Sequence, residues 1–303
     1  MFYSDIGATD KRLALRRALG DGDLHVLPGA FNAASARLIA KAGAAGVYVS
    51  GYMLAADLGL PDLGLTTATE VAERGRQIAR MVDVPTIIDA DTGFGEPMNV
   101  ARTVQTLEDA GLAGCHIEDQ ENPKRCGHSE GVRVVDPDVA VRRVRAAVAG
   151  RRDPAFVLVA RTDARATGTL ADSIRRAEAF VAEGADVIFP EALRGPEEYA
   201  AFRDALDVPL MINLNEFGRG APLTQSEARR LGYNLAVYPV TLMRMAMGAA
   251  MRGLDELLGG DSQQALLSQM QTRDELHDLL DEASYLAFDD RVYRGRPGPG
   301  EAR

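Results

Sequence analysis

Residues 108–119, EDAGLAGCHIED, contain the pattern that decides the fold. They read as the end of a helix at Gly111, a short run that is apolar at nearly every position, and two acids where the run stops. Glycine ends helices in the left-handed conformation, and a continuously apolar run suits a parallel strand buried on both faces. The stretch therefore predicts one helix–strand unit of an α/β protein, with polar side chains at the end of its strand.

The same pattern recurs along the chain as AKAGAAGVYVSG around Gly43, VAEGADVIFPEA around Gly184 and RRLGYNLAVYPV around Gly232. A second form, DVPTIIDAD at 83–91 and DVPLMINLN at 207–215, enters the strand through a proline, which at that position needs no ladder donor. HVLPGA and FVLVARTD complete the set. The sequence thus offers eight strand candidates, near residues 25, 46, 85, 113, 156, 186, 208 and 234.

Helical patterns separate these strands: TATEVAERGRQIARMV, NVARTVQTLEDAG, DPDVAVRRVRAAVAG, LADSIRRAEAFVAEG and TQSEARRLG. Eight such units at a mean spacing of about 30 residues match a (β/α)8 TIM barrel of roughly 250 residues. We predict an α/β fold with a single barrel domain over residues 1–303. An amphipathic helix at 10–19 precedes it, additional C-terminal helices follow from about residue 241, and the tail 294–303 is loose.

Two connections are longer than the others, and both follow a strand. They are SGYMLAADLGLPDLGLTT at 50–67 and DQENPKRCGHSEGVRVV at 119–135. Barrel enzymes keep their chemistry at the carboxyl ends of the strands, so we expect both loops to cover the active site.

The composition disfavours several classes of partner. The chain has 44 acidic and 34 basic residues, a formal net charge of -10 and no dense basic run, which predicts no binding to nucleic acid or to an anionic membrane. It has no run of eighteen apolar residues, and its start, MFYSDIGATDKR, lacks a secretory pattern, so we expect a cytoplasmic protein. The only two cysteines are too few for a disulfide framework and have no CxxC spacing, which predicts free thiols.

Polar side chains gather where the predicted strands end. They are Ser50, Asp89, Asp91, Glu118, Arg161, Glu191, Asn213 and Asn215. Carboxylates crowded at one rim repel each other unless a cation neutralises them. Because no histidine pair accompanies them at metal spacing, the pattern favours Mg²⁺ or Mn²⁺ over Zn²⁺ or copper.

Asp89 and Asp91 are the leading metal candidates. Positions two apart in a continuing strand point to the same side, and the glycines of DTGFG let the backbone approach a ligand. The alternative is that both acids cap the next helix or accept backbone amides in a turn.

The segment NPKRCGHSEG places Cys126 beside Lys124, Arg125 and His128 in the second long loop. Nearby cations lower the pKa of a thiol from its free value of about 8.5, which would let Cys126 exchange a proton near neutrality. The alternative is an accidental surface cysteine. Cys115, inside an apolar run, is predicted to be an inert packing residue.

His116 is predicted to be a hydrogen-bonded core histidine more often than a ligand. Arg161, at the end of a buried strand, needs an anionic partner, and a substrate carboxylate is one candidate. Arg244 and Arg273 could act in the same way, although surface salt bridges are the ordinary alternative for each.

Several motifs together resemble the isocitrate lyase and phosphoenolpyruvate mutase superfamily, from the first helix to about residue 290. They are KRCGH, HIEDQ, DADTGFGEP, LGLPDLG, ARTDA, FPEA, NEFG and MQTRDEL. KRCGH is typical of the lyases of this superfamily and not of its mutases and hydrolases.

The resemblance implies that Asp89 and Asp91 hold Mg²⁺, supported by Asp62 and Glu118. It also implies a small di- or tricarboxylate substrate and a homotetramer in which a C-terminal helix is exchanged between neighbours. The implied substrate-binding residues are Ser50, Gly51, Tyr52, Gly127, Arg161, Glu191, Asn213, Asn215, Arg244 and Arg273.

The implied reaction is the retro-Claisen cleavage of 2-methylisocitrate to pyruvate and succinate, a step of the methylcitrate cycle of propionate catabolism. Cys126 would be the acid, and Tyr48 or a metal-site carboxylate the base. Tyr52 and Asn215 depart from the usual SGGG and NIT patterns and bear on the substrate. The alternatives are a lyase for isocitrate, 2,3-dimethylmalate or oxaloacetate, a phosphonate mutase or hydrolase, and a non-catalytic carboxylate-binding barrel.

Overall fold

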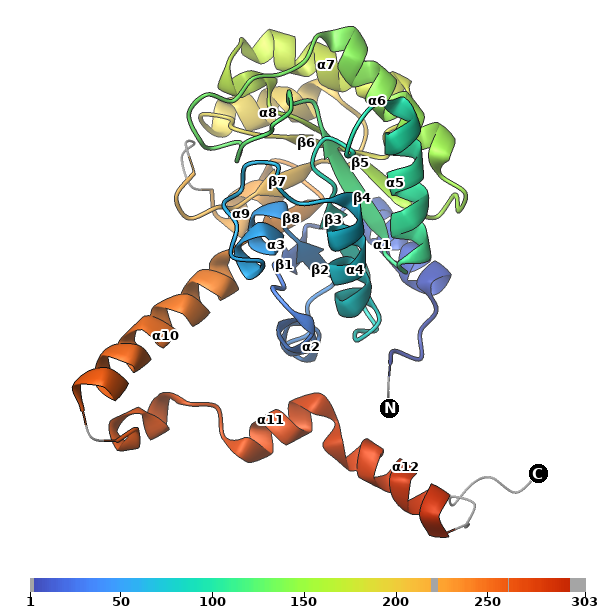
Figure 1. The fold of residues 1–303 in the computed structure, drawn as a ribbon. Coiled ribbons are helices and arrows are strands. Elements are labelled where there is room, and N and C mark those ends of the chain that lie inside the picture. Colours follow the sequence, from blue (N-terminus) through green and yellow to red (C-terminus); the bar gives the residue numbers. More distant parts are fainter. Residues whose placement is uncertain (1–2, 219–222, 261, 295–303) are drawn as a thin grey trace.

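Eight short parallel strands line the centre of the protein (Figure 1). The structure is a computed structural model, and it describes residues 3–218, 223–260 and 262–294. The strands are β1 (His25–Pro28), β2 (Val47–Val49), β3 (Thr86–Asp89), β4 (Gly114–Glu118), β5 (Val157–Thr162), β6 (Val187–Pro190), β7 (Met211–Asn213) and β8 (Leu235–Tyr238). All eight predicted strands are therefore confirmed.

The strands pair in chain order. One sheet runs β2-β3-β4-β5-β6 and the other β1-β8-β7, all in parallel register. Parallel bridges between Gly29 and Tyr48 and between Ile188 and Leu210 join the two sheets at both edges. The predicted α/β barrel fold is thus confirmed, and all strands end at the same rim.

Helices cover the outside of the strands and extend beyond them at the C-terminal end (Figure 1). They are α1 (Ala8–Gly20), α2 (Ala33–Lys41), α3 (Gly51–Asp57), α4 (Ala68–Ala79), α5 (Pro97–Asp109), α6 (Pro137–Gly150), α7 (Leu170–Ala182), α8 (Pro196–Ala205), α9 (Gln225–Arg230), α10 (Thr241–Gly259), α11 (Arg273–Leu280) and α12 (Glu282–Arg294), with short 3-10 helices η1 (Ala164–Ala166) and η2 (Gln264–Gln269). The first long loop differs from expectation, because it starts with α3 directly after β2.

The glycines that define the repeated pattern have the conformation that the sequence predicts. Gly43, Gly111, Gly184 and Gly232 follow α2, α5, α7 and α9 with φ between 76° and 97°. Residues with a side chain rarely adopt this conformation, so these positions fix where each helix ends and the next strand begins.

Alternation along the strands separates the barrel interior from its outer wall. Val157 and Val159 of β5 and Val187 and Phe189 of β6 belong to the inner cluster, which α1 closes with Leu15 and Leu19. The next inward positions, two residues further along each strand, are Arg161 and Glu191. The two-residue alternation that places apolar side chains in the barrel interior therefore also places polar side chains at the rim.

Replacing Phe202 with alanine should lower the free energy of unfolding by about 3–5 kcal/mol, because the ring of this α8 residue is fully buried and its loss leaves a cavity. Urea unfolding monitored by circular dichroism measures the change. Met98→Ala, at a side chain that is 87% exposed, is the control and should change stability by less than about 0.5 kcal/mol. Equal losses in the two variants would contradict the assignment of the core.

The C-terminal arm leaves the barrel at α10 and returns along α2 (Figure 1). Arg37 of α2 donates to the carbonyl of Leu279, and Lys41 pairs with Asp278. No residue of α10 or α12 is buried, and α10 exposes Met245, Met251, Leu254 and Leu258.

No described helix has the length and apolarity to cross a membrane. Of the predicted loose tail, residues 295–303 lie outside the described residues.

Candidate active site

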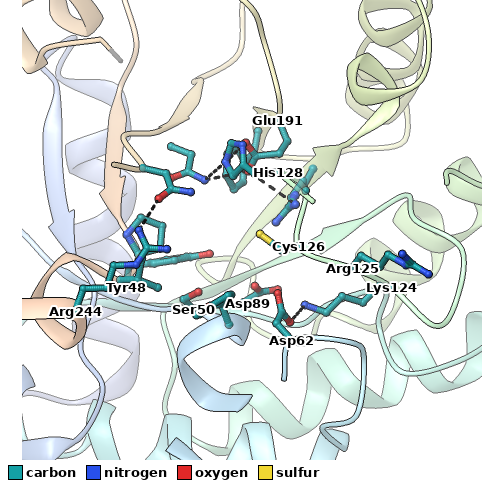
Figure 2. A pocket seen from close by; sticks show the side chains of 18 residues that line it. Tyr48, Ser50, Asp62, Asp89, Lys124, Arg125, Cys126, His128, Glu191 and Arg244 are labelled. Carbon is teal, nitrogen blue, oxygen red and sulfur yellow. Dashed lines mark hydrogen bonds and ion pairs between the residues drawn. The ribbon is translucent and has the colours of Figure 1, made fainter. Parts of the chain in front are cut away.

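One cavity at the carboxyl ends of the strands collects most of the predicted residues (Figure 2). Its lining includes Tyr48, Ser50, Tyr52, Asp62, Asp89, Lys124, Arg125, Cys126, Gly127, His128, Arg161, Glu191, Asn213, Asn215 and Arg244, together with Phe189, Pro239 and Val240. These residues come from the ends of six strands and from both long loops. The rim that the sequence predicts is therefore a single site.

The two aspartates of DAD converge beside Gly51. A Cβ atom at Gly51 would lie 2.8 Å from Asp89 Oδ2 and 3.0 Å from Asp91 Oδ1, so both carboxylates reach the same small volume. Asp91 has a φ of 46°, an uncommon value for a residue with a side chain, which turns its carboxylate back toward Asp89. Neither residue caps α5, whose N-cap is Glu96.

The alternative that the acids accept backbone amides is correct for Asp89. Its two oxygens accept N–H groups from Gly51 at 3.0 Å and from Asp91 at 2.9 Å. Burial alone would raise the pKa of Asp89, but His116, Lys124, Arg161 and the Asp91 amide lower it to about 2. The carboxylate is thus held ionised at a fixed position.

The remaining carboxylates are suited to a hard divalent cation. Burial and the Asp89 charge raise the pKa of Asp91 to about 6, and burial raises that of Glu118. Both Glu118 oxygens are buried and accept no hydrogen bond from the described residues, although Arg161 Nη1 lies 3.3 Å away. A bound cation would reduce the repulsion between carboxylates that are crowded together in this way.

Among the described residues, no three His, Cys, Asp or Glu side chains already surround one point as a complete metal site. This is compatible with Mg²⁺, which keeps several waters and usually takes only one or two protein carboxylates. The residues present therefore fit the magnesium that the sequence resemblance implies: Asp89 and Asp91 would hold it, and Glu118 would support it.

Lys124 links the two long loops. Its Nζ lies 2.5 Å from Asp62 Oδ1 and 2.7 Å from Asp91 Oδ1, and the side chain is buried. Asp62 thus contacts the metal-site carboxylates through the lysine and not directly. Arg125 is exposed and donates instead to the carbonyl of Glu130 in its own loop.

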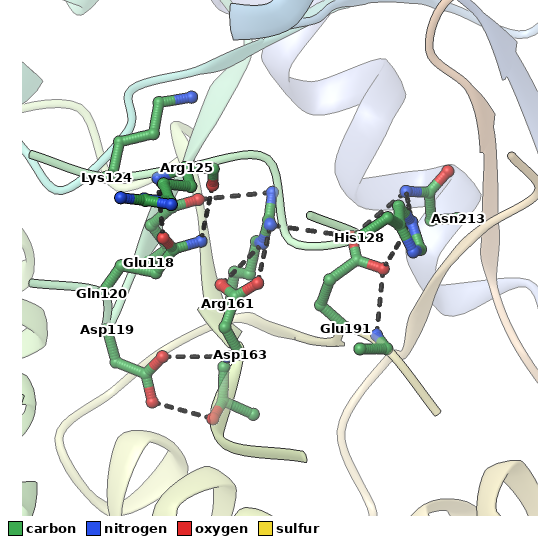
Figure 3. Close-up of polar contacts among 12 residues, drawn as sticks. Glu118, Asp119, Gln120, Lys124, Arg125, His128, Arg161, Asp163, Glu191 and Asn213 are labelled. Atoms are coloured by element: carbon green, nitrogen blue, oxygen red, sulfur yellow. Dashed lines mark hydrogen bonds and ion pairs between the residues drawn. The ribbon is translucent and has the colours of Figure 1, made fainter. Parts of the chain in front are cut away.

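The second long loop lies over the mouth of the barrel. Its base is held by the pairing of Gln120 with Val134, and its tip is held by His128, which contacts Glu191 at 3.2 Å and Asn213 at 3.3 Å (Figure 3). Cys126, between these anchor points, faces the cavity. The thiol and the Asp89 carboxylate therefore line the same cavity.

The prediction that cations lower the pKa of Cys126 is wrong. Burial raises the pKa of this thiol, while Lys124 is paired with aspartates and Arg125 points away. A raised pKa keeps the sulfur protonated at neutrality, which suits a proton donor better than a nucleophile. Cys115 is fully buried in the outer core, as predicted.

Arg161 has protein partners that the sequence did not indicate. Asp163 accepts from it twice, at 3.0 and 2.8 Å, and Glu118 and Glu191 lie 3.3 and 3.8 Å away (Figure 3). Asp163 is in turn oriented by Asp119, which accepts its backbone N–H. A substrate carboxylate would therefore meet a guanidinium already fixed in place. The sequence RTD at 161–163 could have indicated this partner, because Asp163 lies two positions after Arg161 and so on the same side of the chain.

His116 is confirmed as a hydrogen-bonded buried histidine. Its Nε2 lies 2.6 Å from the hydroxyl of Tyr48, and burial lowers the pKa of the imidazole to about 4. Burial and the charge of Asp89 raise the pKa of Tyr48 above its ordinary value, which keeps the phenol protonated and so not available as a base.

The remaining predicted residues divide into two groups. Ser50 is buried and precedes α3, Tyr52 is partly exposed at the rim, and Arg244 contacts Asn215 at 3.4 Å, so all lie where a ligand would enter. Arg273 does not line the cavity. It is exposed at the start of α11, and its expected substrate contact is not found within one chain.

Gly127→Ala should lower kcat/KM strongly while leaving the fold intact. A Cβ atom there would lie 2.5 Å from Arg161 Nη2 and from Asp163 Oδ1, so the loop could not close over the site. Steady-state kinetics and increased tryptic cleavage of residues 121–133 measure the effect. Gly20→Ala, where the added atom meets nothing within 4 Å, is the control. Unchanged kinetics in Gly127→Ala would show that closure is not required.

The contact between His128 and Glu191 should make loop closure depend on pH. Burial opposes the charged imidazole, but the Glu191 carboxylate outweighs it and the pKa of His128 is raised. The ion pair is complete below the ordinary pKa of histidine and is lost as pH rises through the raised value. Tryptic cleavage of the loop should therefore increase with pH across this range, and it should lose this dependence in His128→Gln.

Comparisons with known proteins agree with this geometry. The phosphoenolpyruvate phosphomutase family model matches residues 15–258. A probable 2-methylisocitrate lyase 2 of Corynebacterium glutamicum is 51% identical over 97% of this chain and 95% of its own. The 2-methylisocitrate lyase of Escherichia coli is 40% identical over 90% and 93%.

Solved structures extend the comparison to related activities. An oxaloacetate acetylhydrolase in complex with 3,3-difluorooxalacetate superimposes with a TM-score of 0.87 at 32% identity, covering 97% of this chain and all of that one. A 2,3-dimethylmalate lyase gives 0.86 at 33%, covering 93% and 95%. The chain therefore belongs to the 2-methylisocitrate lyase family, within the phosphoenolpyruvate mutase and isocitrate lyase superfamily.

Proposed function

We propose that this protein is a Mg²⁺-dependent carbon–carbon lyase that cleaves 2-methylisocitrate to pyruvate and succinate, a step of the methylcitrate cycle of propionate catabolism in the cytoplasm. The observation that carries the proposal is the position of the Cys126 thiol in the same cavity as Asp89, whose carboxylate converges with that of Asp91 beside Gly51. Mn²⁺ is a possible substitute for Mg²⁺, because both prefer oxygen ligands.

The bound metal would stabilise negative charge that develops on the substrate oxygen as the carbon–carbon bond breaks. Asp89 and Asp91 would hold it, because their oxygens converge beside Gly51. Ser50 and the residues that start α3 would orient the pyruvate-forming end, and Arg161 and Arg244 would attract the other carboxylates. Closure of residues 119–135 would exclude water from the reacting atoms.

The protons balance in two transfers. A carboxylate of the cavity takes the proton of the C2 hydroxyl, the C2–C3 bond breaks, and C2 becomes the ketone carbon of pyruvate. The electron pair left on C3, beside a carboxylate, takes a proton from Cys126 Sγ, which gives succinate. The raised pKa of Cys126 keeps this proton on the sulfur until the carbanion forms.

Related lyases on isocitrate, 2,3-dimethylmalate or oxaloacetate are the alternatives, and solved relatives act on the last two. The higher identity to 2-methylisocitrate lyases, 51% against 32–33%, favours 2-methylisocitrate. A phosphonate mutase or hydrolase would leave Cys126 without a role. A non-catalytic carboxylate-binding barrel would have no need of both a thiol and a metal site.

A substrate panel tests the proposal directly. The purified protein is incubated with each of the four acids and with phosphonopyruvate, in Mg²⁺ and in EDTA, and the released products are identified. Release of pyruvate from 2-methylisocitrate, abolished by EDTA, is expected. Faster turnover of another acid would reassign the substrate, and metal-dependent binding with no turnover would support the binding protein.

A homotetramer in which the C-terminal arm is exchanged would account for the uncovered apolar face of α10 and for the position of Arg273. In such an assembly the arm of a partner subunit could bring its arginine to this cavity. Analytical ultracentrifugation should give a tetramer, and Met251→Asp should dissociate it. A monomeric wild-type protein with full activity would exclude the exchange.

A further inference from the structure

Tyr48 and His116 form a buried pair at the inner end of the cavity. The Tyr48 hydroxyl lies 2.6 Å from His116 Nε2, the two rings are stacked with centroids 5.8 Å apart, and Phe189 meets the imidazole edge-on at 5.6 Å. His116 is completely buried and Tyr48 nearly so. The hydrogen bond and the two ring contacts therefore fix the direction of the imidazole.

The surroundings of the two imidazole nitrogens decide which one carries the proton. Nδ1 is buried without a hydrogen-bond partner among the described residues, whereas Nε2 faces both the Tyr48 oxygen and, at 3.5 Å, Asp89 Oδ1. A proton on Nδ1 would leave a buried donor unsatisfied and turn a lone pair toward a carboxylate. A proton on Nε2 leaves only an unsatisfied acceptor, which costs less free energy.

With the proton on Nε2, His116 donates to the Tyr48 oxygen. A phenol hydroxyl has a single hydrogen, and that hydrogen cannot point toward His116 while the oxygen accepts a hydrogen bond from His116. The Tyr48 hydrogen must therefore point elsewhere, and the hydroxyl lines the cavity together with Ser50 and Asp89 (Figure 2).

We propose that His116 is a positioning residue that turns the Tyr48 hydroxyl into a fixed hydrogen-bond donor toward the cavity, where it stabilises the substrate oxygen that becomes the product carbonyl. The role deepens the proposed lyase function and rests on it. Tyr48 is then a donor and not the base, so removal of the hydroxyl proton falls to a carboxylate of the cavity. No proton leaves Tyr48 at any step.

Two amide substitutions of His116 separate positioning from packing. The glutamine amide nitrogen reaches the place of Nε2 and can still donate to Tyr48, whereas the asparagine amide reaches only the place of Nδ1. We expect His116→Asn to lower kcat by about 10²- to 10³-fold, the range for loss of one oxyanion donor, with a smaller change in KM. His116→Gln should retain most of the activity.

A double-mutant cycle tests whether His116 acts through Tyr48. Tyr48→Phe should lose at least as much as His116→Asn, and the double variant should be no slower than Tyr48→Phe within about twofold. Losses that multiply, equal losses in the asparagine and glutamine variants, or full activity in His116→Asn would each overturn the inference. His25→Asn and His25→Gln, at a histidine paired with Asp21 outside the cavity, are the matched controls and should change nothing.

Binding of oxalate gives a readout that does not require turnover. Oxalate is a planar dianion with the adjacent oxygens of a pyruvate enolate, so a donor from Tyr48 should strengthen its binding in the presence of Mg²⁺. Calorimetric titration should show weaker oxalate binding in Tyr48→Phe and His116→Asn but not in His116→Gln. If the variants show these oxalate affinities but the wild-type protein does not turn over 2-methylisocitrate, only the proposed substrate is refuted. If His116→Asn binds oxalate with wild-type affinity, the role of His116 is refuted.

Discussion

Cys126→Ser should lower kcat by about 10²- to 10⁴-fold, the usual contribution of a positioned general acid, while leaving Mg²⁺ affinity unchanged. A serine hydroxyl has nearly the same shape but releases its proton far less readily than a thiol. Burial keeps the Cys126 thiol protonated, and no carboxylate of the metal site contacts it through a hydrogen bond in the described residues. Single-turnover measurement of succinate release and a Mg²⁺ titration separate the two effects.

Cys115→Ala is the matched control for this experiment. Cys115 is the other cysteine of the chain, fully buried in the outer core one residue before His116, so its loss should change stability slightly and turnover little. Near-normal turnover in Cys126→Ser would remove the thiol from the mechanism. An equal loss in both variants would indicate damage to β4 and its loop.

Asp89→Asn should weaken Mg²⁺ binding by at least about 10- to 100-fold, the range already found for groups that only support a metal ligand. Turnover at low Mg²⁺ should fall with it. Asparagine keeps the acceptor for one backbone amide but removes the charge that His116, Lys124 and Arg161 stabilise in the folded protein. Because a carboxylate with a lowered pKa contributes stability at neutral pH, we expect the free energy of unfolding without metal to fall.

The Mg²⁺ affinity of the folded variant, measured separately from its stability, distinguishes a metal ligand from a structural acid. Asp83→Asn is the control and should keep the Mg²⁺ affinity of the wild-type protein. Asp83 is an exposed aspartate just before β3, and its carboxylate accepts a hydrogen bond from Ser4. Calorimetric Mg²⁺ titration and thermal unfolding in EDTA measure both quantities. A stable variant that still binds Mg²⁺ with wild-type affinity would exclude Asp89 as a ligand.

Strain and charge at this site agree with a functional role. Asp91 and Ala192, which lie just beyond the ends of β3 and β6, both have positive φ angles although neither is glycine. Such conformations cost free energy and persist where the surrounding structure enforces them. Here they turn the carboxylate of Asp91 toward Asp89 and let the backbone N–H of Ala192 bond the Glu191 side chain.

The sequence by itself determined the barrel and the rim. Glycines after helices and apolar runs before polar residues are local signals, and the period of two along a strand carries Asp89, Arg161 and Glu191 to the same edge. Parallel strands that follow one another in a ring must end on the same side. These features predicted the members of the site without any contact between distant residues.

Only the tertiary structure decided how those members are paired and charged. The contacts of His116 with Tyr48, 68 residues away, and of Lys124 with Asp62, 62 residues away, depend on loop closure and side-chain packing. The same holds for the pKa of Cys126, for which the neighbouring cations in the sequence predicted the wrong direction. Sequence neighbours need not be spatial neighbours, and desolvation is a property of the folded surroundings.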